Sequence, residues 1–261
     1  MHRARKRFGQ NFLNDASVLH AIMRALAANP ARPVLEIGPG RGALTEVLLE
    51  QGLSVTAIEL DRDLLPILRA RLFNHAERLT LINADALHFD FSSLAPQHRP
   101  LQVVGNLPYN ITTPLLFHLL TFHAQLDSMV FMLQKEVVDR LSAEPGGADY
   151  GRLSVMMQFY CTVEPLFGVP PEAFTPQPKV DSAVVRLLPK PLSARELSLV
   201  TPLRNLVRQA FAQRRKTVRN NLRDWVSAEQ FAQLEIDPSL RPQNLTLADY
   251  VRMAELLEAE Q

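Results

Sequence analysis

Cysteine is nearly absent from this chain of 261 residues, which contains only Cys161. A disulfide within the chain and a metal site built from several cysteine ligands are therefore excluded, and a reducing, cytoplasmic compartment is the simplest expectation. Apolar runs are short, and none approaches the roughly 20 residues that a membrane-spanning helix needs. The basic start at residues 2–7 is followed by Gly-Gln-Asn at positions 9–11 instead of an apolar stretch, so it does not have the form of a secretory signal.

An excess of charge of either sign is also missing. The chain carries 28 Lys and Arg against 27 Asp and Glu, a net charge of +1, which excludes a uniformly basic coat for nucleic acid. The positive residues are nevertheless concentrated at 3–7 and at 204–223, and both clusters suit phosphate groups. A solvated arm and a solvated helix face are the plainer interpretation. The second cluster contains Arg204, Arg208, Arg214, Arg215, Lys216, Arg219 and Arg223.

Residues 34–59 have the pattern that opens a nucleotide-binding α/β domain. The largely apolar segment Val34–Ile37 predicts a buried strand, followed by the turn Gly-Pro-Gly-Arg-Gly at 38–42 and a helix from Ala43 to Gln51. Glycines let the backbone approach a ligand closely, and the helix N-terminus faces that ligand. A second strand, Ser54–Ile58, delivers Glu59 at its carboxyl end, where an acidic side chain is placed to bind ribose hydroxyls.

The glycine spacing alone does not choose the cofactor, because Gly38, Gly40 and Ala43 also satisfy the looser dinucleotide pattern. Two acidic residues favour S-adenosylmethionine instead. Glu36 lies inside the first strand, where a dinucleotide site has no need of an acid. Asp85 closes the third expected strand, where it is placed to accept a hydrogen bond from an adenine amino group. A cap for a helix or turn is the alternative role for Asp85.

The hexapeptide Gly-Asn-Leu-Pro-Tyr-Asn at 105–110 is the segment where we expect the chemistry. It follows the apolar pair 103–104 at the end of an expected strand, and in an open α/β sheet the loops at the carboxyl ends of the strands form the ligand crevice. Pro108 has no N–H group and favours an extended residue before it, which leaves backbone carbonyls free to face a ligand. With the amide of Asn106 and the ring of Tyr109, these acceptors suit the exocyclic amino group of a nucleobase. A polar turn is the alternative.

A proline-rich loop at 169–181 holds a single aromatic side chain, Phe174. Prolines make such a loop stiff at low entropic cost, and a closing strand, Ser182–Leu187, follows it. We therefore expect Phe174 to clamp a flat group from the face opposite Tyr109, with Lys179 placed to reach a phosphate. A plug in the hydrophobic core is the alternative role for Phe174.

The chain changes character after residue 188. Pro189-Lys190-Pro191 has the composition of a linker, and the pattern beyond it predicts helices over 203–223, 225–234 and 247–257. We therefore expect an α/β domain with a basic N-terminal arm at 1–188 and a small all-α domain at 189–261.

Five segments of the chain together carry a family resemblance. They are Phe8–Leu13 (FGQNFL), Glu36–Gly40 (EIGPG), Glu59, Asn106–Tyr109 (NLPY) and Phe174–Val185 (FTPQPKVDSAVV). On these motifs the chain resembles the ribosomal RNA adenine N6-dimethyltransferases over essentially its whole length. Within that family it is most similar to the small-subunit branch linked to kasugamycin sensitivity, and the asparagine-x-proline-tyrosine signature of the family is intact.

The resemblance implies a class I S-adenosylmethionine-dependent methyltransferase with a seven-stranded Rossmann-like sheet. It implies transfer of two methyl groups to N6 of each of two adjacent adenosines in the loop of the 3′-terminal helix of 16S rRNA, during small-subunit biogenesis and without a metal. Tyr109 and Phe174 would sandwich the flipped adenine, while Asn106 and the carbonyl of Leu107 would hold its N6 hydrogens. The cofactor contacts expected from the motifs are Asn11, Leu13, Gly38, Gly40, Glu59, Asp85 and Asn106.

Three other enzymes and one non-enzymatic role compete with this interpretation. The large-subunit adenine methylase of macrolide resistance shares much of the motif set, but the N-terminal motif and the continuation Asn-Ile-Thr-Thr-Pro at 110–114 favour the small-subunit enzyme. A DNA adenine methylase would need a target-recognition domain for which the chain has no room. A dehydrogenase is opposed by Glu36 and by the lack of a catalytic His or Lys motif. A ribosome-assembly factor that acts through binding is compatible with the basic C-terminal cluster. We expect a monomer, because no long apolar seam is left over.

Overall fold

The computed structural model describes residues 11–94 and 100–259, and the contacts divide the chain into two compact units. The first unit runs up to Val138 and also includes Val163–Pro189. The second contains Asp139–Thr162 and the residues from Lys190 onward. The units are thus discontinuous in sequence, whereas the sequence suggests a single boundary after residue 188. Residues 139–162 group with the C-terminal helices.

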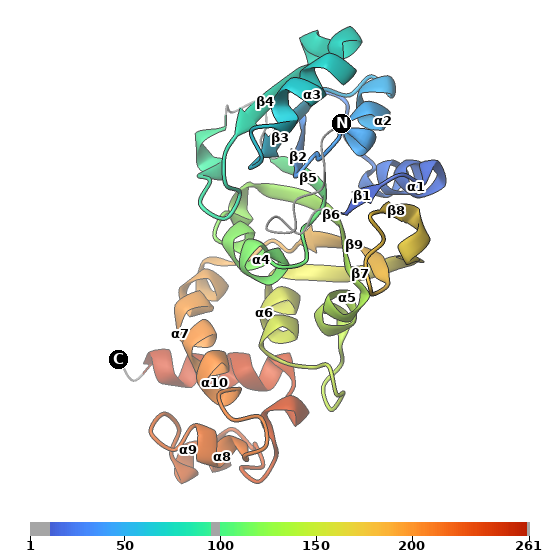
Figure 1. Cartoon of the computed structure of the whole chain (residues 1–261). Helices are drawn as coiled ribbons and strands as arrows, with labels where there is room; N and C mark the ends of the chain where they lie inside the picture. Colours follow the sequence, from blue (N-terminus) through green and yellow to red (C-terminus); the bar gives the residue numbers. More distant parts are fainter. Residues whose placement is uncertain (1–10, 95–99, 260–261) are drawn as a thin grey trace. The chain divides into compact units, whose positions relative to one another are not determined.

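A mixed sheet forms the centre of the first unit. Within the part of the chain described, it has seven strands in the order β4-β3-β2-β5-β6-β9-β7 (Figure 1). The pairs from β4 through β6 are parallel, and β9 is antiparallel to β6. The central strands are nearly continuous apolar runs because helices cover both faces of such a sheet. The strands are β2 (Val34–Ile37), β3 (Val55–Glu59), β4 (Leu79–Asn83), β5 (Leu101–Asn106), β6 (Leu126–Gln134), β7 (Cys161–Val169) and β9 (Ser182–Pro189).

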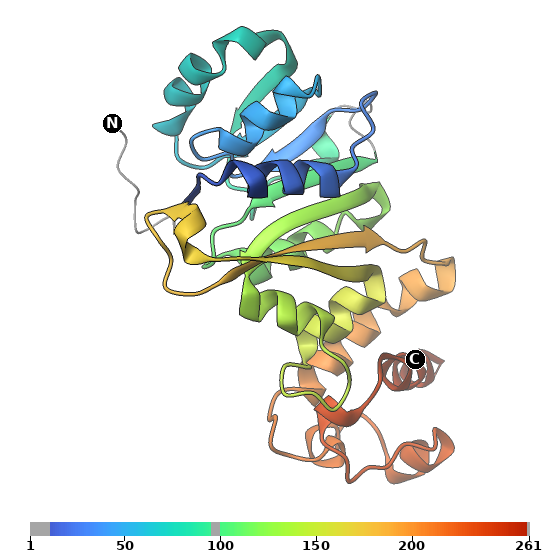
Figure 2. The same ribbon diagram turned by 90° about the vertical axis from the view of Figure 1, so that its right-hand side faces the viewer.

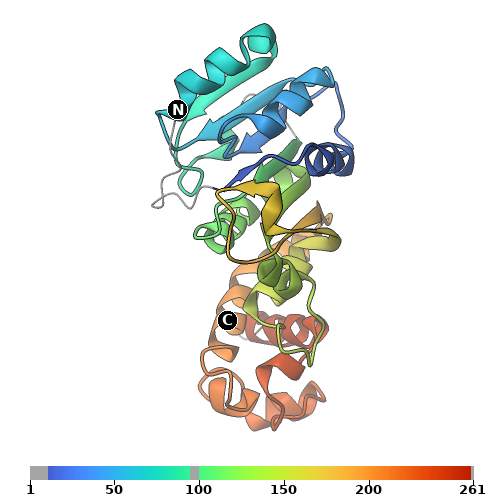
Figure 3. The same cartoon turned by 45° about the vertical axis from the view of Figure 1, so that its right-hand side comes forward.

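Helices lie on both faces of this sheet. They are α1 (Ala16–Leu26), α2 (Ala43–Glu50), α3 (Leu64–Arg71), α4 (Thr112–Leu120) and α5 (Lys135–Ser142). α1 and α2 lie together on one face and α4 on the other (Figures 2 and 3). The carboxylate of Asp15 caps α1 by accepting from the N–H groups of Ser17 and Val18. Short 3-10 turns connect the elements at η2 (Phe73–Arg78), η3 (Phe91–Ser93), η5 (His123–Gln125), η6 (Pro171–Ala173) and η7 (Pro242–Asn244).

A small second sheet joins the N-terminal segment to the loop before β9. β1 (Phe12–Leu13) runs antiparallel to β8 (Phe174–Thr175). Asn14 extends the contact, because its N–H donates to the carbonyl of Ala173 at 2.8 Å and its side-chain amide donates to the hydroxyl of Thr175 at 2.7 Å. These bonds fasten the segment to a distant part of the chain, and the one to Thr175 joins residues 161 positions apart. The basic cluster at 3–7 and the first part of the N-terminal motif, residues 8–10, lie outside the described residues.

The second unit is helical. Its helices are α6 (Arg152–Tyr160), α7 (Ala194–Ala210), α8 (Val218–Asn221), α9 (Ala228–Gln233) and α10 (Leu247–Ala259), together with the end of α5. α7 packs against α10 and α6. The seven basic residues of the predicted cluster at 204–223 are all exposed, on α7, on the turn after it, and at α8 and the turn that follows. In the described part of the chain, we find no helix with both the length and the apolar character to cross a membrane.

The prediction of a helix over 203–223 puts the start of this helix too late. α7 starts at Ala194 because Ser193 and Glu196 form a capping box. The Ser193 hydroxyl accepts from the N–H of Glu196 at 3.2 Å, and the Glu196 carboxylate accepts from the N–H of Ser193 at 2.8 Å. The helix then runs through Pro202, although proline normally disfavours a helix interior.

The same helix also ends earlier than predicted. α7 stops at Ala210 because the amide of Asn221 reaches back and donates to the carbonyl of Ala210 at 2.7 Å and to that of Gln213 at 3.0 Å. These bonds satisfy carbonyls that a longer helix would have used internally. A new helix, α8, starts at Val218 after a cap from Thr217, so the prediction of one continuous helix is wrong.

Candidate active site

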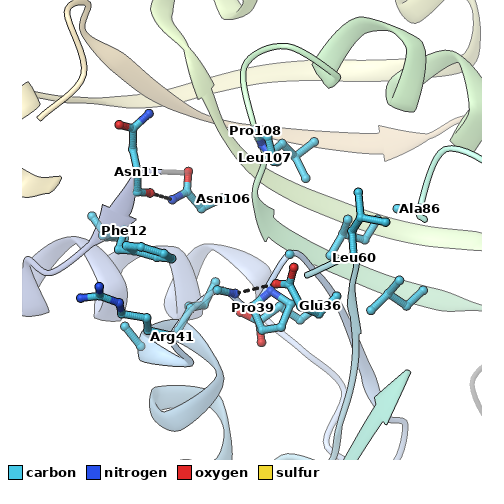
Figure 4. Close-up of a pocket in the computed structure, with 18 of the residues that line it drawn as sticks. Asn11, Phe12, Glu36, Pro39, Arg41, Leu60, Ala86, Asn106, Leu107 and Pro108 are labelled. Atoms are coloured by element: carbon cyan, nitrogen blue, oxygen red, sulfur yellow. Dashed lines mark hydrogen bonds between the residues drawn. The ribbon is translucent and has the colours of Figure 1, made fainter. Parts of the chain in front are cut away.

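A cavity of about 280 Å³ lies at the carboxyl ends of β2, β3 and β5 (Figure 4). Its volume is near the lower end of the range for small-molecule sites, about 300–1,000 Å³. The predicted site residues that line it are Asn11, Leu13, Gly38, Gly40, Glu59, Asp85, Asn106, Leu107 and Tyr109. The fold therefore brings together segments that are far apart in the sequence, as the motifs predict. Phe174 does not line this cavity.

The glycine-rich turn forms one wall of the cavity. Gly38 and Gly40 have φ angles of +70° and +57°, a conformation that residues with a side chain rarely adopt. A Cβ atom on Gly40 would also lie 3.1 Å from the ring of Phe12. The turn therefore brings its backbone close to the N-terminal segment, and α2 begins directly after it at Ala43.

Two residues of this wall were not predicted as site residues. The guanidinium carbon of Arg41 lies 4.4 Å from the centre of the Phe12 ring, a cation–π contact (Figure 4). Phe12 was visible in the sequence as an aromatic between Asn11 and Leu13, both of which the resemblance marks. Its pairing with Arg41 depends on the fold of the glycine turn and has no local signal.

Glu59 ties β3 to the glycine turn. Its carboxylate accepts from the N–H of Gly40 at 3.1 Å and from the N–H of Asp61 at 2.8 Å, and it is 6% exposed. Burial raises the pKa of Glu59, and the two backbone donors oppose that rise. The carboxylate is thus held rigidly at the cavity wall, and its contact with ribose hydroxyls stays a prediction.

Asp85 caps a turn and also lines the cavity, and its contact with an adenine amino group stays a prediction. Its Oδ1 accepts from the N–H of Leu87 at 2.9 Å, which caps a turn. Its Oδ2 lies 3.0 Å from Nδ1 of His88, an exposed residue. Asp85 also lines the cavity, so a turn cap and an acceptor for a ligand are compatible in one side chain.

Glu36 is the most deeply buried acid of the site. It is 2% exposed, and its Oε2 has no hydrogen-bond partner within the described residues. Burial raises its pKa from 4.5 to about 7, the nearby hydroxyl of Thr45 opposes that rise, and the charge of Glu59 adds to it. A buried acceptor without a partner costs free energy, and a ligand that carries an amine would supply the missing partner. S-adenosylmethionine, with its ammonium group, fits this requirement.

Asn106 ends β5 and reaches toward the N-terminal segment (Figure 4). Its Nδ2 donates to the carbonyl of Asn11 at 3.0 Å. Because a carbonyl only accepts, the NH₂ end of the amide must face Asn11, and Oδ1 is left for another group. The N–H of the buried residue Leu107 donates to the carbonyl of Met132 at 3.2 Å, and within the described residues no hydrogen bond reaches the Leu107 carbonyl. Two acceptors are therefore uncommitted at this point of the chain.

The two predicted aromatic platforms have different environments. Tyr109 is half-buried, and its phenol oxygen lies 2.6 Å from the hydroxyl of Ser182. Burial raises the pKa of Tyr109. Phe174 is 2% exposed and belongs to the hydrophobic core, where it stands opposite Leu13 in the small sheet. That position matches the alternative of a core plug, and a contact between Phe174 and a flipped base stays a prediction.

In the described ranges 11–94 and 100–259, no group of three or more His, Cys, Asp and Glu side chains is arranged to hold a metal ion.

This architecture matches known proteins in both sequence and structure. The model of the family described as ribosomal RNA adenine dimethylase matches residues 1–259. The protein named ribosomal RNA small subunit methyltransferase A from Pseudomonas aeruginosa is 56% identical over 259 residues, 98% of this chain and 95% of that protein. Its counterpart of the same name from Hahella chejuensis is 55% identical over 257 residues, 97% of this chain and 93% of that protein.

Solved structures agree with the family match. A dimethyladenosine transferase from Plasmodium falciparum superposes with a TM-score of 0.81 at 26% identity, over 95% of this chain and 98% of that one. The 23S rRNA methyltransferase ErmE superposes with a TM-score of 0.73 at 26% identity, over 95% of this chain and 100% of that one. The predicted fold class, a methyltransferase α/β sheet followed by a helical region, is confirmed. The chain belongs to the ribosomal RNA adenine dimethylase family.

Proposed function

We propose that this chain transfers methyl groups from S-adenosylmethionine to N6 of two adjacent adenosines, two groups to each, in the loop of the 3′-terminal helix of 16S rRNA. Relatives that are more than half identical over nearly the whole chain carry the name ribosomal RNA small subunit methyltransferase A. The observation that carries the proposal is the pair of uncommitted acceptors at the end of β5, Asn106 Oδ1 and the Leu107 carbonyl, on the same cavity wall as Tyr109.

The cavity fits S-adenosylmethionine as the methyl donor, which supplies an electrophilic methyl group on a positive sulfonium when bound. Glu36 would be the partner for the ammonium group, because its buried Oε2 has no hydrogen-bond partner among the described residues. Glu59 would hold the ribose hydroxyls and Asp85 the adenine amino group, and both residues line the cavity. The segment Asn11–Leu13 and the glycine-rich turn close the remaining walls.

The acceptor pair addresses the main difficulty of the reaction. The lone pair of adenine N6 is delocalised into the ring, so this nitrogen is a weak nucleophile. Hydrogen bonds from the N6 hydrogens to Asn106 Oδ1 and the Leu107 carbonyl, two in the first transfer and one in the second, would favour a tetrahedral nitrogen and aim its lone pair at the methyl group. This is catalysis by positioning and by stabilisation of developing charge. As the new N–C bond forms, the S–C bond of the sulfonium would break to leave a neutral thioether, and the surplus proton on N6 would be lost to water.

The target base has to leave its stack to reach the cavity, which costs a few kcal/mol. Stacking on Tyr109 returns about 1–3 kcal/mol, the range for one base on one aromatic ring. A second platform at Phe174 would require that side chain to leave the core position in which it is 2% exposed. Tyr109 is therefore the platform that is available without rearrangement, and Phe174 the one that binding would have to recruit.

Two observations favour the small-subunit substrate over the large-subunit alternative. The 23S rRNA methyltransferase ErmE is 26% identical to this chain, about half the identity of the small-subunit methyltransferases. The continuation at 110–114 points the same way. The precursor of the small subunit as partner, a monomeric state and a cytoplasmic location are part of the proposal, as is a role in assembly through the exposed basic residues at 204–223.

The test is a methyl-transfer assay on small subunits that lack the modification, followed by mass mapping of the labelled RNA. We expect two neighbouring dimethylated adenines near the 3′ end of 16S rRNA, and no product on 23S rRNA or on DNA. Label on 23S rRNA would overturn the assignment in favour of the large-subunit alternative. A catalytically inactive variant that still restored assembly would place the main role in binding.

A further inference from the structure

We propose that Ser182 is a positioning residue that holds the ring of Tyr109 in place for the target adenine. This inference rests on the proposed function and deepens it, because it gives a role to a residue outside the cavity. Ser182 does not line the cavity, so any effect on the reaction must pass through a residue that does.

Ser182 is a buried polar residue with one evident partner. It is 0% exposed, it begins β9, and it stands opposite Gln134 of β6. A buried hydroxyl is nearly always hydrogen-bonded, and the group that meets this one is the phenol of Tyr109, with the two oxygens 2.6 Å apart. That separation lies within the normal range for an O–H···O hydrogen bond.

This bond fixes the far end of a ring whose near end is already held. Tyr109 follows Pro108, whose carbonyl accepts from the N–H of Ile111 and from the hydroxyl of Thr112, both at 3.1 Å. The ring itself turns about two side-chain torsions. With its backbone held by these bonds and its hydroxyl tied to a buried strand, the long axis of the ring has one preferred direction and position.

Ser182 also connects the two predicted platforms. The loop 175–181, most of it exposed, starts next to Phe174 and ends at Ser182. The last residue of that loop, Asp181, is fastened to the sheet because its carbonyl accepts from the N–H of Lys135 at 2.9 Å. One segment therefore begins with the aromatic expected on one side of the base and ends with the hydroxyl that holds the aromatic on the other.

A double-mutant cycle on methyl transfer tests the link. We would measure kcat/KM for unmethylated small subunits, and Kd for S-adenosylmethionine, in Ser182→Ala, Tyr109→Phe and the double variant. Ser128→Ala is the matched control, since Ser128 is also a buried serine of the sheet but lies in β6. Ser182→Thr keeps the hydroxyl and serves as the rescue variant.

We expect each single variant of the pair to lower kcat/KM by about 3- to 10-fold, the range of one hydrogen bond. The double variant should lose no more than the worse single variant, Ser182→Thr should recover most of the activity, and Kd for S-adenosylmethionine should stay within about twofold. If the two losses multiply in the double variant, or if Ser128→Ala loses as much, the role assigned to Ser182 is wrong.

A spectroscopic readout checks the contact without relying on activity. The chain contains four tyrosines, so labelling with 3-fluorotyrosine gives a small set of ¹⁹F signals, and Tyr109→Phe identifies one of them. Ser182→Ala should move that signal alone, and an unchanged signal would overturn the inference. A wild-type protein that binds S-adenosylmethionine but methylates no rRNA adenine overturns the proposed function and this role with it. An active wild type with a multiplicative cycle overturns only the role of Ser182.

Discussion

The side-chain amide nitrogen of Asn106 and the carbonyl oxygen of Asn11 lie 3.0 Å apart, so the end of β5 is joined to the N-terminal segment. The next residues of that segment form β1, which pairs with β8. One hydrogen bond therefore orients the Asn106 amide, which we propose holds the target amine. The acceptor of that bond belongs to the N-terminal segment, which we propose contacts the cofactor. The direction in which Asn106 Oδ1 points depends on the N-terminal segment being in place.

Replacement of Asn106 by alanine tests the acceptor role. Asn106→Ala removes Oδ1, and we expect kcat to fall by at least about 100-fold, as for other groups that stabilise developing charge. The Kd for S-adenosylmethionine should change by less than about tenfold, because most of the cavity wall is intact. Single-turnover methylation and calorimetric titration measure the two quantities. Equal losses in both would contradict the assigned role.

Asn106→Asp is the matched variant for the bond to Asn11. Aspartate keeps an acceptor at this position but has no N–H to donate to the Asn11 carbonyl. If that bond orients the side chain, Asn106→Asp should also lose most of its turnover while it keeps the shape of the residue. Near-normal turnover in this variant would show that an acceptor suffices and that the bond to Asn11 is dispensable.

The two roles of Asp85 are separable by substitution. Asp85→Asn keeps an oxygen that can cap the N–H of Leu87 but replaces the second carboxylate oxygen by a donor, which cannot accept from an adenine amino group. We expect its Kd for S-adenosylmethionine to rise about tenfold or more with no change in Tm, whereas Asp85→Ala should lose affinity and also unfold at a lower temperature. Unchanged affinity in Asp85→Asn would show that Asp85 caps the turn and does not bind the adenine amino group.

The parts of the site that were predictable are those with a local signal. The strand Val34–Ile37, the glycine turn after it and Glu59 follow from apolar runs, turn chemistry and spacing, and the structure places them as expected. The hexapeptide at 105–110 was recognisable because it follows directly on a buried strand. Such features need only a few consecutive residues to be specified.

The contacts that were not predictable join residues far apart in the chain. The bond from Tyr109 to Ser182 spans 73 residues and depends on the order of β5, β6 and β9 in the sheet. The bond from Asn106 to Asn11 spans 95 residues and depends on the pairing of β1 with β8. Phe174 illustrates the limit, since a single aromatic in a stiff loop is equally suited to a core plug and to a platform. α7 was misplaced because its start and its end are set by side-chain caps, whose partners outweigh the apolar pattern.

The requirement for glycine at position 105 is visible only in the fold. A Cβ atom at this position of β5 would lie 2.5 Å from the carbonyl oxygen of Ile37 in the neighbouring strand. We expect Gly105→Ala to lower the free energy of unfolding by about 1–3 kcal/mol, a fall in Tm of roughly 2–10 °C. The matched control is Gly168→Ala in β7, where nothing lies within 4 Å of the added carbon. Similar melting temperatures for the two variants in calorimetry would contradict the close approach.

The buried carboxyl of Glu36 predicts how stability depends on pH. Its pKa rises from 4.5 to about 7 on folding because burial disfavours the charged form. Between these values the folded chain binds more protons than the unfolded chain, so the free energy of unfolding falls as the pH increases, by about 3 kcal/mol in total when the pH passes 7. Glu36→Gln has no proton to lose and should not show this fall. In urea titrations of the ligand-free protein, the free energy of unfolding of the variant should therefore increase relative to that of the wild type as the pH rises from 4.5 to 8.

S-adenosylmethionine should reverse that ranking if Glu36 meets its ammonium group. Above pH 7 the wild-type carboxylate is charged, and its Oε2 has no partner in the part of the chain that the structure describes. An amine therefore relieves the cost of burial and binds more tightly as the pH rises through 7. Glu36→Gln offers the amine no charge, and its affinity should be weaker and flatter with pH. The variant would then be the more stable protein without ligand and the poorer binder with it. Parallel pH curves of affinity for the two proteins would show that the ammonium group is held elsewhere in the cavity.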